Sequence, residues 1–166
     1  DFGSKTYLYP MPVLIIGTYN EDGTANAMNA AWGGISDFDK IAIALSNHKT
    51  TDNLKQTKSF TVSVGTASMV EACDYVGIVS GNKIPDKVSR AGLHAIKSKY
   101  VNAPIFKELP LALECEVISF DEKSEVLTGK IINVSADEEI LTDGNIDVKK
   151  LRPITYDPVN HYYIEL

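Results

Sequence analysis

A histidine, a lysine and two threonines stand side by side where a short helix is predicted to begin. The stretch reads SNHKTTDNL, residues 46–54, and follows an apolar, β-prone run. A helix start presents backbone N–H groups without partners and the positive end of the helix dipole, so anions bind there. Lys49 would add a full charge, and hydroxyls can donate to phosphate oxygens. The alternative is that Thr50 or Thr51 is a plain N-cap beside a solvated Lys49 and His48. Because caps are common, this stretch alone does not indicate a phosphate site.

A second group of polar residues lies in NAMNAAW, residues 26–32, at the end of a predicted strand. Alternation along a strand would place Asn26, Met28, Ala30 and Trp32 on one face. Small alanines would let a flat ring approach the backbone, and asparagine amides offer both donors and acceptors to a ring edge. The alternative is that Trp32 is a core aromatic residue and the asparagines line the mouth of a barrel. The residues leave both interpretations open.

Other common catalytic patterns are missing from the sequence. There is no GxGxxG after the first strand, no P-loop and no GxSxG. The three histidines lie far apart and have no metal-ligand spacing, so no metal site is predicted. Pairs of carboxylates occur only in turn-like settings, where exposure to water is enough to explain the presence of charged residues. We therefore assign no catalytic acid, base or nucleophile.

Composition narrows the class of protein. The chain has 166 residues and a formal net charge of -6, which argues against a nucleic-acid partner because such binding depends on clustered lysines and arginines. No apolar run approaches the roughly 20 residues of a membrane-spanning helix, and the first residues have no signal-peptide core. Cys73 and Cys115 are expected to be buried free thiols, which favours a cytoplasmic protein.

The elements that must position these residues are mostly strands. In the first part of the chain, a hairpin is expected over 12–32 with its turn at 20–23. It is followed by a loop over 33–40, a strand over 41–46 and a helix over 51–58.

The second part of the chain is also mainly strand. We expect a strand near 59–66 and a helix from Ser68, with Glu71 completing a capping box. A loop with helical turns is expected over 80–103. The strongest signal is a long hairpin, 109–134. Residues 137–150 are expected to form a surface loop with one helical turn. The pattern predicts one mainly β domain, residues 1–166, built as a closed or partly closed antiparallel barrel with a few short helices.

The order of these stretches resembles the flavin reductase-like family of FMN-binding split barrels, which includes flavoredoxins and NAD(P)H:FMN oxidoreductases. The similar stretches are YPMPVLIIGTYNEDGTANAMNAAW, IAIALSNHKTTDNL, SFTVSV and LRPITYDPVNHYYIEL. The resemblance covers most of the chain and is weakest over 80–103. Family members often continue past the Tyr-Tyr strand into a glycine-containing tail, whereas this sequence ends at Leu166, so contacts of such a tail are not assigned.

The resemblance implies a split barrel that forms a homodimer, with each FMN near the subunit interface. It implies that NAMNAAW lies along the isoalloxazine ring and that SNHKTT forms the phosphate-binding turn. A lysine in SGNKIPDK would lie near the flavin. The cofactor-binding residues implied in this way are Asn26, Asn29, Ala30, Ala31, Trp32, Ser46, His48, Lys49, Thr50, Thr51 and Lys87.

Three functions follow as hypotheses. The first is an FMN-dependent oxidoreductase, in which hydride passes from NADH or NADPH to flavin N5 and electrons pass on to an acceptor. The second is a non-enzymatic FMN electron carrier that serves a redox partner protein, as flavoredoxins are thought to do. The third is a module that binds another phosphorylated small molecule. The sequence does not decide among donors or acceptors.

Overall fold

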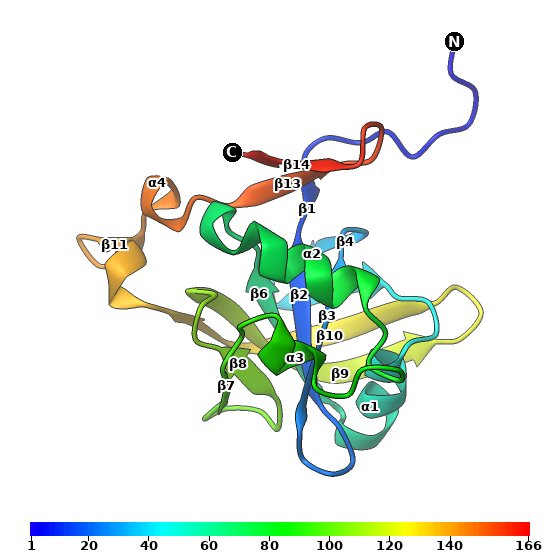
Figure 1. Cartoon of the computed structure of the whole chain (residues 1–166), viewed down its shortest axis with the longest axis vertical. Coiled ribbons are helices and arrows are strands. Elements are labelled where there is room, and N and C mark those ends of the chain that lie inside the picture. Colours follow the sequence, from blue (N-terminus) through cyan, green and yellow to red (C-terminus); the bar gives the residue numbers. More distant parts are fainter.

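A seven-stranded antiparallel sheet forms the centre of the computed structural model, which describes residues 1–166 (Figure 1). Its strand order is β3-β2-β6-β9-β10-β5-β4, so β3 and β4 are the two edges. The sheet curls, because side chains from β3 and from β5 meet in one buried cluster. The fold is a mainly β split barrel, as predicted. The strands of this sheet are β2 (Leu14–Tyr19), β3 (Ala25–Ala30), β4 (Gly33–Asp37), β5 (Lys40–Ala44), β6 (Ser59–Val64), β9 (Leu111–Asp121) and β10 (Val126–Ala136).

Three small sheets and several short helices surround the barrel. The sheet β1-β13-β14 lies at the end of the molecule from which the N-terminal segment extends (Figure 1). No helix is both long and apolar enough to cross a membrane. The remaining strands are β1 (Met11–Pro12), β7 (Ala95–Lys97), β8 (Pro104–Phe106), β11 (Leu141–Thr142), β12 (Asn145–Ile146), β13 (Ile154–Asp157) and β14 (Tyr162–Glu165). The helices are α1 (Lys49–Thr57), α2 (Val70–Ile78), α3 (Lys87–Arg90) and α4 (Val148–Leu151), with 3₁₀ turns η1 (Ala67–Met69) and η2 (Glu138–Ile140).

The interior of the barrel is one of two apolar cores. Alternate residues of each strand point inward, as Ile16 on β2 and Phe60 and Val62 on β6 do. Leu54 of α1 joins the same cluster, so this helix closes one end of the barrel. Each such side chain is at most 1% exposed, and its burial contributes roughly 1.5–3 kcal/mol. This core fixes the position of α1 relative to β2 and β3.

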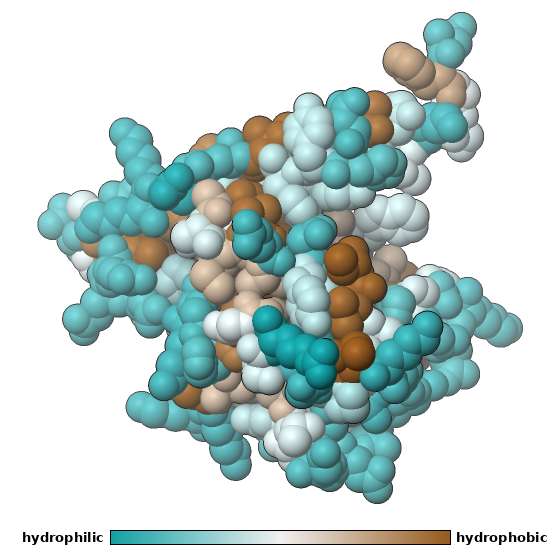
Figure 2. Space-filling view, viewed as in Figure 1, coloured by the Kyte–Doolittle hydropathy of each residue, from teal (hydrophilic) through white to brown (hydrophobic).

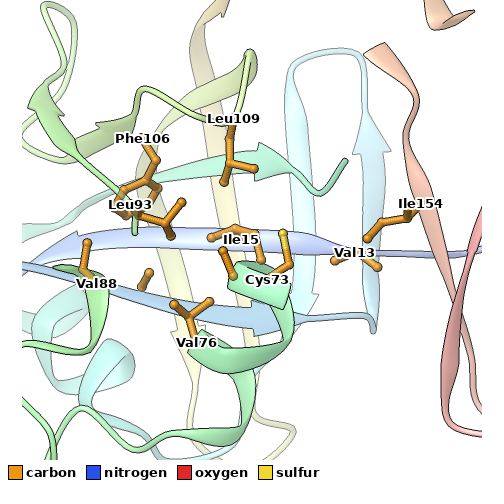
Figure 3. Close-up of a cluster of buried hydrophobic side chains, with 11 residues drawn as sticks. Val13, Ile15, Cys73, Val76, Val88, Leu93, Phe106, Leu109 and Ile154 are labelled. Carbon is orange, nitrogen blue, oxygen red and sulfur yellow. The ribbon is translucent and has the colours of Figure 1, made fainter. Parts of the chain in front are cut away.

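The second core lies on the outer face of the sheet, under α2 and α3. Figure 3 shows Cys73 and Val76 reaching from α2 toward Ile15 on β2. Helix α2 also lies against the edge strand β3, where Ala27 faces it. Both faces of β2 and β3 are therefore packed, and the small residues of β3 are what let α2 come close.

The structure confirms the main strand predictions. The hairpin β2–β3 turns at Asn20–Thr24, and β9 pairs with β10 as the long hairpin, interrupted by two register shifts. Both cysteines are buried free thiols, with Cys73 in α2 and Cys115 in β9.

The predicted loop over 33–40 is wrong, because residues 33–37 form the edge strand β4, paired with β5. Glycines normally indicate a loop. Here Gly33 is needed for a close approach, since a Cβ atom at this position would lie 2.9 Å from Ile43 Cγ1 and 3.0 Å from the Ala42 carbonyl oxygen.

Three helix predictions also need correction. Helix α1 begins at Lys49 with His48 as its N-cap, earlier than predicted, so Thr50 and Thr51 lie inside the first turn. The Ser68–Glu71 capping box does not form, because Ser68 belongs to the 3₁₀ turn η1 and α2 begins only at Val70. Residues 137–150 contain η2, the hairpin β11–β12 and α4, so they are more ordered than a loop with one turn.

Candidate functional site

The first turn of α1 keeps two backbone N–H groups free. Thr51 Oγ1 accepts from the His48 N–H at 3.0 Å and donates to the His48 carbonyl at 2.7 Å, which commits its one proton. The His48 ring is held by Ser46, with Oγ and Nε2 2.9 Å apart. The N–H groups of Lys49 and Thr50 have no acceptor in the protein. They point out of the helix start and can bind an anion.

A buried set of amides and hydroxyls anchors this turn to the barrel. Asn26 on β3 donates from Nδ2 to Thr50 Oγ1 at 2.8 Å, and both residues are at most 2% exposed. One turn later, Asn53 donates to Thr18 Oγ1 at 3.0 Å and to Asn20 Oδ1 at 2.9 Å. Because polar groups buried in this way are costly to leave unpaired, the network fixes how α1 presents its free N–H groups.

These free N–H groups border a pocket of about 160 Å³ between α1, β3 and the end of α2. Figure 2 shows apolar and strongly hydrophilic side chains next to each other over the end of α2 and the loop that follows it. No carboxylate lines the pocket, although the chain as a whole has a formal net charge of -6. The lining residues are Asn26, Met28, Asn29, His48, Lys49, Thr50, Val76, Gly77, Ile78, Val79, Ser80, Gly81 and Lys87.

Lys87 supplies a second cation from the far side of the pocket. It is only 4% exposed, and its Nζ donates to the carbonyls of Val76 at 2.9 Å and Val79 at 2.8 Å, at the C-terminal end of α2. Burial lowers the pKa of Lys87 to about 8. Two of its three ammonium hydrogens are used in these bonds, so one is left for a ligand.

Gly81 brings the loop after α2 onto the floor of the same pocket. A Cβ atom here would lie 2.5 Å from Asn26 Oδ1 and 3.4 Å from Lys49 Cβ. A side chain at residue 81 would therefore push Asn26 or Lys49 from its place. The glycine therefore keeps the pocket next to the start of α1 open.

Asn29 reaches the pocket from the other face of β3. Its Nδ2 donates to the Cys73 carbonyl on α2 at 3.1 Å and to Tyr163 Oη on β14 at 3.4 Å. Asn26 points instead toward α1, because residues three apart on a strand lie on opposite faces. The two predicted asparagines therefore join different elements to one pocket.

The structure does not bring every predicted residue to this pocket. Ala31 and Trp32 line a separate cavity of about 470 Å³, together with the N-terminal segment. The expectation that Trp32 shares a strand face with Asn26 is wrong, because β3 ends at Ala30 and Trp32 lies past it, 59% exposed. Ala30 packs in the inner core, while Ser46 and Thr51 support the helix start from outside the pocket.

No motif in the sequence indicates the pocket residues that the end of α2 contributes. Gly77, Val79 and Gly81 line the pocket, and they come from a stretch assigned to a helix end and a loop. The only signal was the serine and glycine pair directly after the apolar helix pattern, which indicates a chain reversal but not a ligand.

A carboxylate on the outer face of the barrel borders another cavity, of about 400 Å³. Glu114 is fully buried there and accepts from Ser98, Ser135 and Asn133. Ser98 in turn accepts from the N–H groups of Tyr100 and Val101. These bonds explain Glu114 as the anchor of the turn after β7, and they use most of the acceptor capacity that its carboxylate could offer to a ligand.

Comparison with known proteins gives the family. The family model described as "Flavin reductase like domain" matches residues 6–158, and the chain belongs to this family. Among solved structures, the chain is 34% identical to flavoredoxin of Desulfovibrio vulgaris (Miyazaki F), with a TM-score of 0.95, covering 100% of this chain and 92% of that chain. It is 27% identical to a flavoredoxin from Methanosarcina acetivorans, with a TM-score of 0.89, covering 100% and 90%. It is also 25% identical over 159 residues to an uncharacterized protein of Aquifex aeolicus (strain VF5), covering 87% of this chain and 79% of the relative.

Proposed function

We propose that this chain is an FMN-binding flavoprotein whose cofactor phosphate binds at the first turn of α1. The observation that carries the proposal is the pocket itself: Lys49, Lys87 and two free N–H groups border it, and no carboxylate does. Cationic side chains placed around a helix start in an otherwise acidic chain form an anion-binding site. The family membership supports identifying that anion as the phosphate of a flavin nucleotide.

The hydroxyl of Thr50 fits this role better than that of Thr51. Thr50 Oγ1 accepts from Asn26 and donates to no protein group, so its proton is available in the pocket. The proton of Thr51 is already bonded to the His48 carbonyl. We therefore assign Lys49 and Thr50 to the phosphate and give Thr51 the role of holding the turn.

The ring of the cofactor would lie along the free edge of β3, toward Trp32. The pocket at α1 is small, so it holds the phosphate end of a flavin nucleotide and leaves the ring outside. Strand β3 is an edge of the sheet and has unpaired backbone groups there. Asn29 would offer polar contacts to the ring, and Trp32 an apolar surface at its far end.

The chemistry we propose is transfer of electrons from NADH or NADPH to an acceptor. When bound, the flavin supplies this chemistry by accepting a hydride and passing its electrons on. Neither cysteine is suited to act as a nucleophile, since burial raises the pKa of Cys73 to about 11 and of Cys115 to about 12. The residues of the protein bind and orient the cofactor and tune its potential.

A carrier function is the second candidate. It is favoured by the 34% identity to a flavoredoxin over the whole of this chain. In that case the electrons would come from a redox partner protein, and neither NADH nor NADPH would reduce the flavin.

We also propose that the chain acts as a homodimer, through the face next to β4. Trp32, Ile35 and Phe38 are each at least 59% exposed on or beside this edge strand. Exposed apolar groups of this size gathered at one sheet edge are typical of an interface. A second subunit there would cover the exposed side chain of Trp32.

Two measurements test the proposed flavin binding and the two candidate functions. The absorption spectrum of the purified protein, before and after added FMN, shows whether it binds a flavin. Anaerobic mixing of the holoprotein with NADH or NADPH then separates the two functions: rapid bleaching supports the oxidoreductase, while reduction only by a ferredoxin-like protein supports the carrier. A chain that takes up no FMN would exclude both and leave the binding of another phosphorylated molecule.

A further inference from the structure

The side-chain amide of Asn29 has only one of its two ends occupied. Its Nδ2 donates to the Cys73 carbonyl and to Tyr163 Oη, and its Oδ1 has no hydrogen-bond partner in the protein. The single fully buried side-chain polar atom without a partner is Ser63 Oγ, so the Asn29 oxygen is not enclosed in the core. Asn29 borders the pocket at α1 and lies on the edge strand β3, along which we place the ring, so this oxygen is free to accept a hydrogen bond from a ligand there.

Tyr163 and the Cys73 carbonyl together determine which end of the Asn29 amide faces α2 and β14. The Tyr163 hydroxyl has one hydrogen and donates it to Asp74 Oδ1 at 2.8 Å. Its oxygen can therefore only accept from Asn29. The Cys73 carbonyl is also only an acceptor, so both neighbours require the NH₂ end of the amide.

The surroundings hold this arrangement rigid. A Cβ atom at Gly77 would lie 2.9 Å from Asn29 Cβ, so α2 already lies against the base of this side chain. Burial, together with the bond to Asp74, raises the pKa of Tyr163 above its ordinary value. The phenol therefore keeps its proton, and the bond to Asp74, throughout the neutral pH range.

We propose that Tyr163, held by Asp74, is a positioning residue that fixes the Asn29 amide oxygen as the acceptor for an N–H group of the bound flavin ring. This inference rests on the proposed function, and it adds a specific arrangement from the C-terminal strand β14. Tyr163 acts through Asn29. Without the hydroxyl, only the Cys73 carbonyl holds the NH₂ end of the amide, so the oxygen is held less firmly toward the ring, which changes the relative stability of the oxidised and reduced flavin.

The test compares Tyr163→Phe with Tyr156→Phe in the holoprotein. Tyr156 is the cross-strand partner of Tyr163, and its hydroxyl bonds to the His161 ring at 2.8 Å instead of reaching Asn29. We expect Tyr163→Phe to shift the flavin midpoint potential and to weaken FMN binding by about 2- to 10-fold, the usual range for one hydrogen bond. Tyr156→Phe should change neither quantity. Wild-type potential and affinity in Tyr163→Phe would overturn the proposal.

A double-mutant cycle shows whether Tyr163 acts through Asn29. In an Asn29→Ala background, Tyr163→Phe should cause no further change in potential or affinity. An undiminished effect in that background would contradict the proposal. In the apoprotein, the NMR signal of the Asn29 side-chain NH₂ should shift in Tyr163→Phe and not in Tyr156→Phe, and an unchanged signal would refute the anchoring without any flavin. Failure of wild type to bind FMN would instead refute the proposed function, so the two failures are distinguishable.

Discussion

The helix start at α1 and the exposed surroundings of Trp32 differ in how completely one chain builds them. At α1, Asn26, Thr50 and Thr51 are each at most 2% exposed and bonded to protein partners, so the donors for a ligand already point the right way. Around Trp32 the side chains are apolar and open, and the N-terminal segment is the other wall of the cavity. In the proposed function, one chain would hold the anionic end of the ligand by itself. The apolar end would need a further surface, which we propose a second subunit supplies.

The largest effect should follow from charging the apolar face. Ile35→Asp would place a carboxylate at each copy of a two-fold interface, and loss of a well-packed interface residue costs about 2–4 kcal/mol. We expect the dimer to dissociate in sedimentation experiments, with the monomer still folded because Ile35 is 67% exposed. Val148→Asp is the control, since Val148 is 57% exposed on the separate helix α4. A stable dimer in Ile35→Asp would place the interface elsewhere.

Removing the cation at the helix start should be the next largest change. Lys49→Ala should weaken FMN binding by about 1.5–3 kcal/mol, the loss expected for a hydrogen bond to a charged group. Titration with FMN, followed by quenching of flavin fluorescence, measures it. Lys55→Ala serves as the control, because Lys55 lies in the last turn of α1 and pairs with Glu122 at 2.7 Å. Equal affinities in the two variants would exclude the phosphate assignment.

The two threonines should differ in their effect on FMN binding. Thr50→Val should weaken FMN binding by about 1 kcal/mol, because it removes a hydroxyl proton that no protein group uses, and it should also lower the free energy of unfolding, because Asn26 loses its acceptor. Thr51→Val should lower the free energy of unfolding by about 1 kcal/mol through loss of the capping interaction with His48, and leave FMN affinity nearly unchanged. Chemical denaturation of the apoproteins and FMN titrations measure both quantities. The assignment fails if Thr51→Val weakens FMN binding as much as Thr50→Val does.

The smallest effect should be a dependence of binding on pH. Because the pKa of free Lys87 is about 8, a bound phosphate favours its charged form, and FMN affinity should fall by a few fold as the pH rises from 7 to 9. In Lys87→Gln, whose amide can still donate to a carbonyl, this dependence should flatten.

Unfolding does not explain such a loss of affinity. The folded pKa lies below the ordinary 10.5, so the unfolded chain binds the proton more tightly and the stability contributed by Lys87 rises from about pH 8 upward. A decline in affinity that persists unchanged in Lys87→Gln would show that another group is responsible.

The sequence predicted what depends on local patterns and missed what depends on close approach. Alternating apolar residues were enough to predict the long hairpin and the barrel, whereas the helix-start residues Lys49, Thr50 and Thr51 were assigned to a phosphate only through the family resemblance. Gly33 led to a wrong loop prediction, because a glycine is required at this position by close contact with β5 and not by a turn. The contacts of Gly77 and Gly81 with the two asparagines join segments about fifty residues apart, and no spacing within one segment could indicate them.

Lys87 bonded to the end of α2 also bears on how the cofactor comes and goes. Its two carbonyl partners, like the bonds of Asn26 and Thr51, are made within the chain and do not depend on a ligand. Because these bonds are made by the chain itself, we expect the helix start to keep its shape whether or not a flavin is bound. In the proposed function, folding and uptake of the cofactor would then be separate events, and a chain that has lost its flavin could bind another.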